Sequence, residues 1–423
     1  MKPSGSLKGL NVGIVGASVA GLATARFLLE RGAMVTLMER SKSRLEERGG
    51  GIALDPDLLA LLGPIRHQPI HARIVVGASG KVLWTKKLRK CSTAWSEVYR
   101  SLYNCVPDTL VQRGLAVQSC SPLHDGVLIR FEGDARPPAK FDFVVGADGV
   151  GSVVRGVVDP EFRPQYLGYV ALRGQIEEES LSAALDPLRA WANQSAMVNC
   201  YGNRSHIVAY WIPSAKGKSL NWMWYRNVEP TALGAFMSDE SGKPHHWSLP
   251  PGRVPLSRCK QLADEMTRLF PAPFSLLAAH TDNLSMQAIN GGVPAQWVRG
   301  ALALVGDAAH VAVPHIGAGS SFAIQDALSL AEALAAEGSD ATPESCVTPR
   351  SESCLASCVE SRLASWANDR REKTVKQLQV ATMLGHSLQH EDHDFDRWHE
   401  QDFESWWSGI TEGADLYFDR KTH

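Results

Sequence analysis

The N-terminal segment holds the pattern that most restricts the fold. Residues 11–15 form a nearly continuous apolar run, which is typical of a parallel strand buried on both faces. A turn at residues 16–21, a helical pattern ending at Gly32, a second apolar run at residues 34–38, and then Glu39 follow in order. This succession of strand, turn, helix and strand within about 30 residues predicts a βαβ unit that binds a dinucleotide.

The turn departs from the usual G-x-G-x-x-G pattern at one position. Gly16 and Gly21 occupy the first and third glycine positions, Ser18 stands at the second, and Val19 and Ala20 complete the turn. Serine is small and can donate a hydrogen bond to phosphate, so we expect pyrophosphate at the N-terminus of the helix. Glu39, about 20 residues farther along, is placed to accept hydrogen bonds from a ribose.

Two later strands have the same buried character. Residues 141–145 run into Gly146-Ala147-Asp148-Gly149, and residues 301–305 run into Gly306-Asp307. Between them, residues 165–281 alternate in polarity and are rich in aromatic side chains, which is typical of antiparallel hairpins. We therefore expect an α/β fold: a Rossmann-like cofactor domain, an inserted and mostly antiparallel substrate domain, and C-terminal helices.

The same patterns give domain boundaries. The cofactor-binding domain is assigned to residues 1–70, 97–164 and 282–385, and the substrate domain to residues 71–96 and 165–281. Residues 336–358 are rich in Ser, Thr, Pro and Glu and are expected to form a surface insertion, and residues 386–423 an aromatic-rich terminal segment. Phe395, Trp398, Phe403 and Trp406 are predicted on one helix face, which packs against the body or forms a homodimer contact.

Composition excludes several classes of function. The 423 residues contain 43 Lys and Arg against 45 Asp and Glu, so electrostatics does not favour binding to nucleic acid or an anionic membrane. No apolar run is long enough to span a bilayer, and the N-terminus lacks the apolar core of a signal peptide. The eight cysteines are scattered without a CxxC pair, so we expect free thiols in a reducing cytoplasm and no metal site. This holds also for Cys346, Cys354 and Cys358, whose spacing does not suit zinc.

A second constellation follows the last buried strand. Asp307 stands at the strand tip, where its carboxylate can accept hydrogen bonds from polyol hydroxyls. Pro314 and then Gly317, Ala318 and Gly319 lead into a helix, so backbone N–H groups at a helix N-terminus can approach a ligand closely. A reduced flavin carries negative charge along one edge, which such a helix end would favour.

Together these motifs resemble those of the single-component FAD-dependent aromatic hydroxylases, the family typified by para-hydroxybenzoate hydroxylase. The dinucleotide turn with Glu39, the Asp148-Gly149 motif and the Gly306-Asp307 motif occur in the family's order, and the match covers most of residues 10–385. Within the family the chain most resembles the 2,6-dihydroxypyridine 3-hydroxylases, on residues 166–174 and 206–213 and on the serine in the first turn.

The resemblance implies a fold of the glutathione-reductase type, a bound FAD and residue roles. Glu39 would hold the adenosine ribose with Arg40 beside the adenine, and Asp307 would hold the ribityl chain. The remaining implied cofactor contacts are Gly50, Gly51 and Ile52 along the flavin ring, Arg100 near the phosphates, Asp148 and Gly149 at the middle turn, and Pro314, Gly317, Ala318 and Gly319 at the flavin pyrimidine. NAD(P)H would dock transiently, and one atom of O₂ would pass through a flavin hydroperoxide to a small electron-rich aromatic or N-heteroaromatic ring.

Substrate-side candidates lie on the inserted sheet and beside the third motif. His206, Tyr210 and Tyr225 are on predicted strands, and His315 follows Pro314. Imidazole and phenol groups could bind or polarise a substrate hydroxyl, although sheet packing is the alternative for each. Strand alternation puts Met223 and Tyr225 on one face, and Arg173 would hold an anionic substrate or form a structural ion pair.

Three other functions remain open from the sequence. The same fold could catalyse epoxidation or another oxygen insertion on a natural-product intermediate. A flavin reductase or a halogenase is a second alternative, and a halogenase is disfavoured because the segment at residues 222–226 lacks the Ile-Pro of the W-x-W-x-I-P motif. A non-catalytic flavin-binding protein would bind FAD without accelerating NAD(P)H oxidation.

Overall fold

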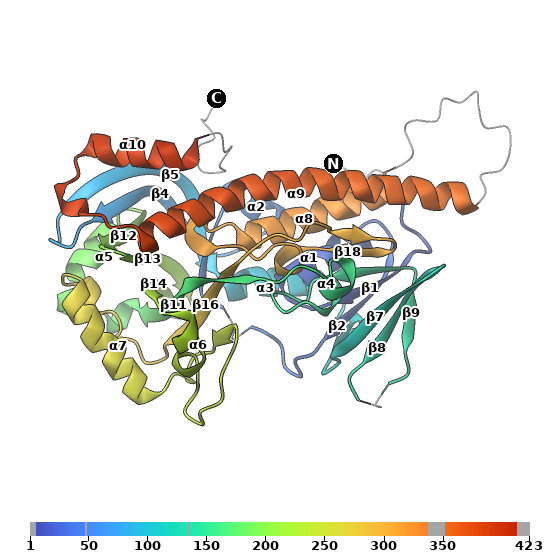
Figure 1. The fold of residues 1–423 in the computed structure, drawn as a ribbon, viewed down its shortest axis with the longest axis horizontal. Coiled ribbons are helices and arrows are strands. Elements are labelled where there is room, and N and C mark those ends of the chain that lie inside the picture. Colours follow the sequence, from blue (N-terminus) through green and yellow to red (C-terminus); the bar gives the residue numbers. More distant parts are fainter. Residues whose placement is uncertain (1–5, 47–48, 134–135, 337–351, 413–423) are drawn as a thin grey trace.

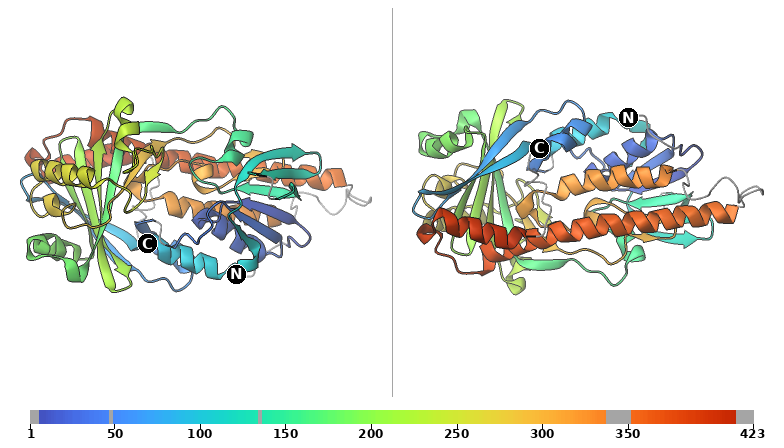
Figure 2. Two further views of the ribbon diagram at one scale, coloured as in Figure 1. Left: turned by 90° about the horizontal axis from the view of Figure 1, so that it is seen from below. Right: turned by 90° about the horizontal axis from the view of Figure 1, so that it is seen from above.

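Two large sheets dominate the structure, a computed structural model that describes residues 6–46, 49–133, 136–336 and 352–412. Figure 1 shows the six-stranded sheet in one half of the molecule and the nine-stranded sheet in the other, with one long helix running along both, and Figure 2 shows the same arrangement from two further sides. In the described part of the chain, no helix is long and apolar enough to cross a membrane.

The six-stranded sheet contains the predicted βαβ unit. Its strand order is β17 (Val298–Arg299), β18 (Leu302–Leu304), β10 (Phe143–Gly146), β1 (Asn11–Val15), β2 (Met34–Glu39) and β6 (Val111–Arg113). All neighbours are parallel except β17 and β18. The three predicted buried strands therefore lie side by side as β18, β10 and β1, so their C-terminal turns meet at one edge of the sheet.

Helices and a small sheet enclose this sheet. Helix α1 (Val19–Leu29) packs against α8 (Gly319–Ala335) and α3 (Trp95–Asn104), and α4 (Val153–Val158) contacts β10 and β18. A three-stranded antiparallel sheet of β7 (Val117–Leu123), β8 (Gly126–Phe131) and β9 (Ala139–Phe141) contacts β1, β10 and α4.

The nine-stranded sheet is antiparallel except where β12 runs parallel to β4. Its order is β15 (Ser248–Leu249), β16 (Ser285–Gly291), β11 (Gln165–Glu177), β14 (Gly217–Asn227), β13 (Ser205–Ser214), β12 (Ala196–Gly202), β4 (Gln68–Val76), β5 (Val82–Ala94) and β3 (Gly51–Leu54). The remaining helices are α2 (Pro56–Leu61), α5 (Asp186–Ala192), α6 (Pro230–Phe236), α7 (Leu256–Leu269), α9 (Glu352–His390) and α10 (Glu400–Thr411).

The domain boundaries expected near residues 70 and 386 do not coincide with the observed ends of strands and helices. Residues 51–54 and 68–70, assigned to the cofactor domain, pair in the nine-stranded sheet because β3 and β4 both hydrogen-bond to β5. Most of the expected insertion at 336–358 lies outside the described residues, as do Cys346 and the side chains of Cys354 and Cys358. Helix α9 already begins at Glu352 and continues past the expected boundary at 386.

The C-terminal aromatic side chains pack on the body of the same chain, but not from one helix. Phe395 lies in a short 3-10 turn, and α10 begins only at Glu400, so the prediction of a single helix face is wrong. The rings nevertheless cluster, since Phe395 lies 4.8 Å from Trp398 and 5.3 Å from Tyr201 between centroids. Phe403 stacks on Trp84 at 5.6 Å, which fixes α10 over β5, as Figure 1 shows.

Candidate cofactor and substrate site

The first turn has the close backbone approach that its glycines predict. Gly16 adopts a φ of +98°, and a Cβ there would strike the carbonyl of Ala147 in the neighbouring turn. A Cβ on Gly21 would strike the carbonyl of Gly16. Both positions therefore require glycine, because the two turns and the helix pack directly on one another.

The N-terminus of α1 opens onto a cavity of about 350 Å³. Ser18, Val19 and Ala20 line it, and Ser18 is the N-cap residue without a side-chain capping hydrogen bond. The first N–H groups of α1 have no partner within the helix, so they and the Ser18 hydroxyl are available to an anionic ligand.

Glu39 is buried against the same turn. Its Oε2 accepts from the N–H of Ala17 at 3.0 Å and its Oε1 from the N–H of Ser41 at 2.8 Å. The two arginines expected near the adenine and the phosphates are not among the residues that line the cavity. Arg40 is exposed, and Arg100 on α3 pairs with Glu97 at 2.9 Å.

Asp148 shapes the middle turn and does not line the cavity. Its carboxylate accepts from the Ser152 hydroxyl and from the N–H of Val153 at 2.7 Å, which caps the N-terminus of α4. Gly149, with φ +79°, lines the cavity beside it. Arg155 follows on α4 and donates to the carbonyls of Asp307 at 3.1 Å and Ala308 at 3.2 Å, which joins the middle turn to the third.

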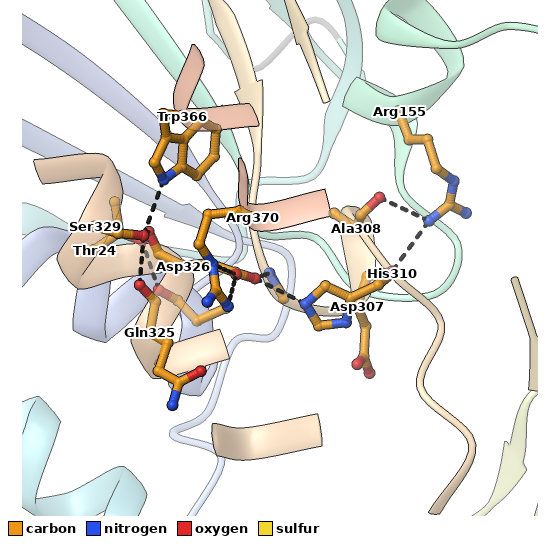
Figure 3. Close-up of polar contacts among 12 residues, drawn as sticks. Thr24, Arg155, Asp307, Ala308, His310, Gln325, Asp326, Ser329, Trp366 and Arg370 are labelled. Carbon is orange, nitrogen blue, oxygen red and sulfur yellow. Dashed lines mark hydrogen bonds and ion pairs between the residues drawn. The ribbon is translucent and has the colours of Figure 1, made fainter. Parts of the chain in front are cut away.

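The Asp307 carboxylate opens into the cavity, and no described protein donor binds it. Although Asp307 is exposed to this space, the surrounding protein desolvates its carboxyl group and raises its pKa. The turn is fixed from behind by Asp326 of α8, which accepts from Gly306 N at 3.0 Å and from His310 Nε2 at 2.8 Å. Figure 3 shows this buried network and the Asp307 side chain pointing away from it.

The start of α8 is the fourth segment that lines the cofactor half of the cavity, which is the half formed by the three turns. Gly317 has φ +62°, a left-handed conformation that glycine adopts without strain. Pro314, Gly317, Ala318 and Gly319 all line the cavity, and Ala318 caps α8 without a side-chain hydrogen bond. Two helix N-termini and one unpartnered carboxylate thus face one space, which suits a ligand that carries phosphate, polyol and an anionic edge, as FAD does.

Strand β3 of the nine-stranded sheet closes the cofactor half of the cavity. Gly51 and Ile52 line the cavity, and Gly51 N donates to Asn221 Oδ1 at 2.7 Å. A Cβ on Gly51 would lie 2.6 Å from Asn221 Cγ, so the glycine allows β3 to approach β14. Gly50, just before β3, lies close to the side chains of both Asn221 and Arg173, since a Cβ there would be 3.3 Å from Asn221 Oδ1 and 3.8 Å from Arg173 Nη1.

The other half of the cavity is one face of the nine-stranded sheet. Strand alternation directs Met223 and Tyr225 of β14 into the cavity, while Trp222 and Trp224 are buried in the core on the opposite face, as the sequence indicated. The cavity-lining residues of neighbouring strands include Arg73, Leu88, Lys90, Arg173, Met197, Asn199, Tyr201, His206, Val208, Tyr210 and Gln287.

The four predicted substrate-side residues come together here. His206 stacks on Tyr225 at 4.5 Å between centroids, and His315 lies 4.7 Å from Tyr225 and 5.2 Å from His206. His315 Nε2 is hydrogen-bonded to the Tyr169 hydroxyl at 2.8 Å. Tyr210, two residues from Val208 on β13, lines the same space.

Burial keeps these side chains uncharged. Desolvation lowers the pKa of His206 well below its usual value and that of His315 to about 3, and the charge of Arg73 acts in the same direction. Desolvation raises the pKa of Tyr225 to about 12, and it also raises that of Tyr210. At neutral pH the cluster therefore consists of hydrogen-bonding groups without charge.

Sequence reasoning missed several residues of the cavity wall. Arg73, Lys90, Asn199 and Tyr201 lie on the cavity face of their strands, a fact that alternation alone cannot give before the strand order is known. Helix α9 also contributes, because Leu384 and Leu388 line the cavity and Gln389 Nε2 donates to His206 Nδ1 at 2.8 Å. No sequence motif indicates that either leucine lies at a site.

Known proteins are similar to this chain over most of its length. A family model described as FAD binding domain-like matches residues 166–291. The 2,6-dihydroxypyridine 3-monooxygenase of Paenarthrobacter nicotinovorans is 28% identical over 337 residues, which cover 76% of this chain and 82% of that protein. The 6-hydroxynicotinate 3-monooxygenase of Pseudomonas fluorescens is 24% identical over 343 residues, which cover 76% and 82%.

The fold has a solved counterpart. The structure of 2,6-dihydroxypyridine-3-hydroxylase from Arthrobacter nicotinovorans superposes with a TM-score of 0.80 at 24% identity, covering 92% of this chain and 95% of that one. By both sequence and fold, the chain is a relative of the FAD-dependent aromatic monooxygenases.

Proposed function

We propose that the chain is an FAD-dependent monooxygenase that uses NAD(P)H and O₂ to hydroxylate a small electron-rich aromatic or N-heteroaromatic ring. One observation carries the proposal: the helix ends at Ser18 and Ala318 and the carboxylate of Asp307 open onto the same cavity as an aromatic sheet face. A cofactor with a phosphate chain and a redox-active ring fits the first half, and a small planar substrate fits the second.

The residues that would hold FAD are those of the three turns. The N–H groups at the start of α1 bind phosphate, Asp307 accepts from the ribityl hydroxyls, and the start of α8 favours negative charge on the flavin. Glu39, which also accepts from Ala17 N, would accept hydrogen bonds from the adenosine ribose. When bound, FAD would supply the redox chemistry, in which electrons pass from NAD(P)H to O₂ and one oxygen atom is transferred to the ring.

The neutral cluster would orient and polarise the substrate. Gln389 Nε2 donates to Nδ1 of His206, so neutral His206 carries its proton on Nε2 and can donate a hydrogen bond. A donor beside a ring hydroxyl favours its ionised form, which raises the electron density of the adjacent ring carbons. Tyr210, Tyr225 and His315 would position the ring and exclude water, since each lines the cavity wall.

We also propose that the protein acts in the cytoplasm and that NADH or NADPH binds only transiently. The five described cysteines are free thiols, which is usual in a reducing compartment.

The test is substrate-stimulated turnover. Purified protein loaded with FAD should oxidise NADH or NADPH faster when the correct hydroxylated ring is added, and the product should contain one additional oxygen atom. The position of that atom separates ring hydroxylation from epoxidation. Protein that retains FAD but oxidises NAD(P)H equally slowly with every ring would contradict the proposal and indicate a flavin-binding protein without this activity.

A further inference from the structure

An indole lines the cavity beside the cofactor half and has no role in the proposed reaction. It belongs to Trp95, the first residue of α3. The N–H of Trp95 donates to the carbonyl of Gly50 at 2.9 Å, and a Cβ on Gly49 would lie only 2.7 Å from the indole Cγ. The indole therefore packs directly against the segment that the family resemblance places along the flavin ring.

Two tyrosines continue from this indole along one side of α3. Tyr99 stacks on Trp95 with 5.2 Å between ring centroids and 19° between the ring planes. Tyr103 follows Tyr99 at 5.6 Å and 31°. The three residues are four positions apart in the helix, so helical geometry brings their rings together. Both tyrosines are buried, and the row of rings thus leads from the cavity through the interior of the protein.

The last ring of the row has a proton acceptor at the protein surface. The Tyr103 hydroxyl donates to Oδ1 of Asp108, whose side chain is exposed. Arg113 and Arg44 hold this carboxylate at 2.5 Å and 3.5 Å. Their guanidinium groups also lie 5.4 Å and 4.5 Å from the centroid of the Tyr103 ring. Positive charge so close disfavours a cationic ring, so an electron leaves this phenol most readily together with its proton, which Asp108 accepts.

The middle ring is placed differently. The Tyr99 hydroxyl accepts from the N–H of Leu45 at 3.4 Å, and burial raises the pKa of this phenol. A phenol that keeps its proton does not retain an oxidised state, so Tyr99 is suited to pass charge between its two neighbours. Tyr103, with its carboxylate partner, is the ring on which an oxidised state would persist.

We propose that Trp95, Tyr99 and Tyr103 form a path that carries oxidising equivalents from the cofactor half of the cavity to the protein surface. The inference rests on the FAD of the proposed function but needs no substrate. When blue light excites bound FAD, the Trp95 indole gives it one electron, and electrons from Tyr99 and then Tyr103 refill the vacancy. The net result is one electron gained by FAD, one lost by Tyr103, and the Tyr103 proton moved to Asp108. In turnover the oxidant is a radical formed from O₂ beside the flavin, which takes up this electron and a proton from solvent.

The test is illumination of FAD-loaded protein without substrate or NAD(P)H. Flash photolysis follows the flavin absorbance, and electron paramagnetic resonance of frozen samples identifies the radical that remains on the protein. The unsubstituted protein should give a long-lived tyrosyl radical, and Y103F should lose it. D108N keeps all three rings but removes the carboxylate that accepts the proton, so the long-lived signal should be lost there too. W95F should lose radical formation altogether, because the first electron donor is absent.

A matched control is W191F in α5, which removes an indole that stacks on Phe274 and is not among the residues that line the cavity. It should leave the radical yield unchanged, and FAD content shows whether each variant is folded. A tyrosyl signal that persists in Y103F, or radical formation that persists in W95F, overturns the inference while the proposed function stands. If the radical appears but every ring fails to accelerate NAD(P)H oxidation, the proposed function fails and the path stands. Protein that does not bind FAD overturns both.

Discussion

At the scale of single residues, Asp307 is the side chain on which the cofactor assignment most depends. Its carboxylate faces the cavity and is bound by no described donor, so the fold does not need it for its own hydrogen bonding. We expect D307A to bind FAD about tenfold or more weakly, because hydrogen bonds from polyol hydroxyls to a charged acceptor are lost. FAD content and Kd, measured by flavin fluorescence, check this, with D282A on an exposed loop as the control. Full FAD occupancy in D307A would show that the third motif has been misassigned.

A substitution at Gly385 tests how α9 packs against the substrate half of the cavity. This residue lies near the C-terminal end of α9, where a Cβ would be 2.5 Å from His315 Cδ2 and 2.7 Å from the Tyr169 hydroxyl. G385A should lower the free energy of unfolding by about 1–3 kcal/mol through overpacking and weaken substrate binding, with FAD content preserved. G409A in α10 meets no atom within 4 Å and is the matched control in the same denaturation series. A G385A protein as stable as the parent would contradict this packing.

The neutral histidines predict how stability depends on pH. The pKa of His315 is lowered from 6.5 to about 3 by burial, so between these values the unfolded chain binds a proton that the folded chain does not. The free energy of unfolding should therefore fall as the pH falls from 7 toward 3, with a contribution of at most about 1.4 kcal/mol per pH unit from this histidine. Denaturant titrations of the parent and H315Q across this range measure the difference. Equal slopes in both proteins would mean that His315 is protonated in the folded state.

Residue positions at the cavity were predictable where a motif fixes them and not where they depend on the tertiary fold. Ser18, Asp307 and Gly319 belong to turns recognisable in the sequence, Gly51 was implied by the family resemblance, and all four line the cavity. No local sequence pattern indicates that Arg73 lines the cavity, since its exposure and its neighbours depend on the parallel pairing of β4 with β12. Arg100 resembled a phosphate-binding arginine, but its neighbour Glu97 on the same helix turn binds it.

At the scale of elements, a buried ion pair joins the two longest helices next to the site. Arg370 of α9 donates to Asp326 Oδ1 of α8 through Nε at 3.0 Å and Nη2 at 2.6 Å, and Asp326 also holds the backbone of Gly306. Figure 3 shows this aspartate between Arg370 and His310. The charges of Arg370 and His310 hold the pKa of Asp326 below its usual value despite its burial.

Breaking this pair should therefore cost both stability and cofactor. R370Q leaves a buried carboxylate without its main counter-charge, and we expect the free energy of unfolding to fall by about 3–5 kcal/mol. FAD affinity should fall with it, because Asp326 positions the turn that carries Asp307. Chemical denaturation and FAD titration measure both effects, and K376Q, on the exposed side of the same helix, should change neither. R370Q with unchanged stability and FAD affinity would contradict this role.

Elements were predicted well inside the sheets and poorly beyond them. Residues 11–15 coincide with β1, and the segment at 206–212 lies within β13, because buried runs and strict alternation are strong local signals. Helix α9 extends over 39 residues from a segment whose beginning is Ser-rich, where composition favoured a loop. The break between Phe395 and α10 could not be read from spacing, since the rings meet in space from two separate elements.

At the scale of the whole molecule, the substrate space is built from distant parts of the chain. Figure 1 shows α9 passing from α8 at the first sheet to β13 and β14 of the second, and the contacts of these elements agree. The cavity therefore has one wall from three turns, one from a sheet face and a further one from a C-terminal helix. The α/β class and the inserted sheet were predictable from sequence, whereas this closure by α9 depends on long-range packing that leaves no periodic signal.

The central claim is that this cavity directs one atom of dioxygen onto a bound ring. The most direct measurement is turnover in ordinary water under dioxygen labelled with a heavy oxygen isotope. The FAD-loaded protein is supplied with NAD(P)H and with the ring that most accelerates NAD(P)H oxidation. Our account predicts a hydroxylated product that carries one heavy oxygen atom, and no product from protein stripped of FAD. A product whose new oxygen comes from water, or its formation without FAD, would contradict the account.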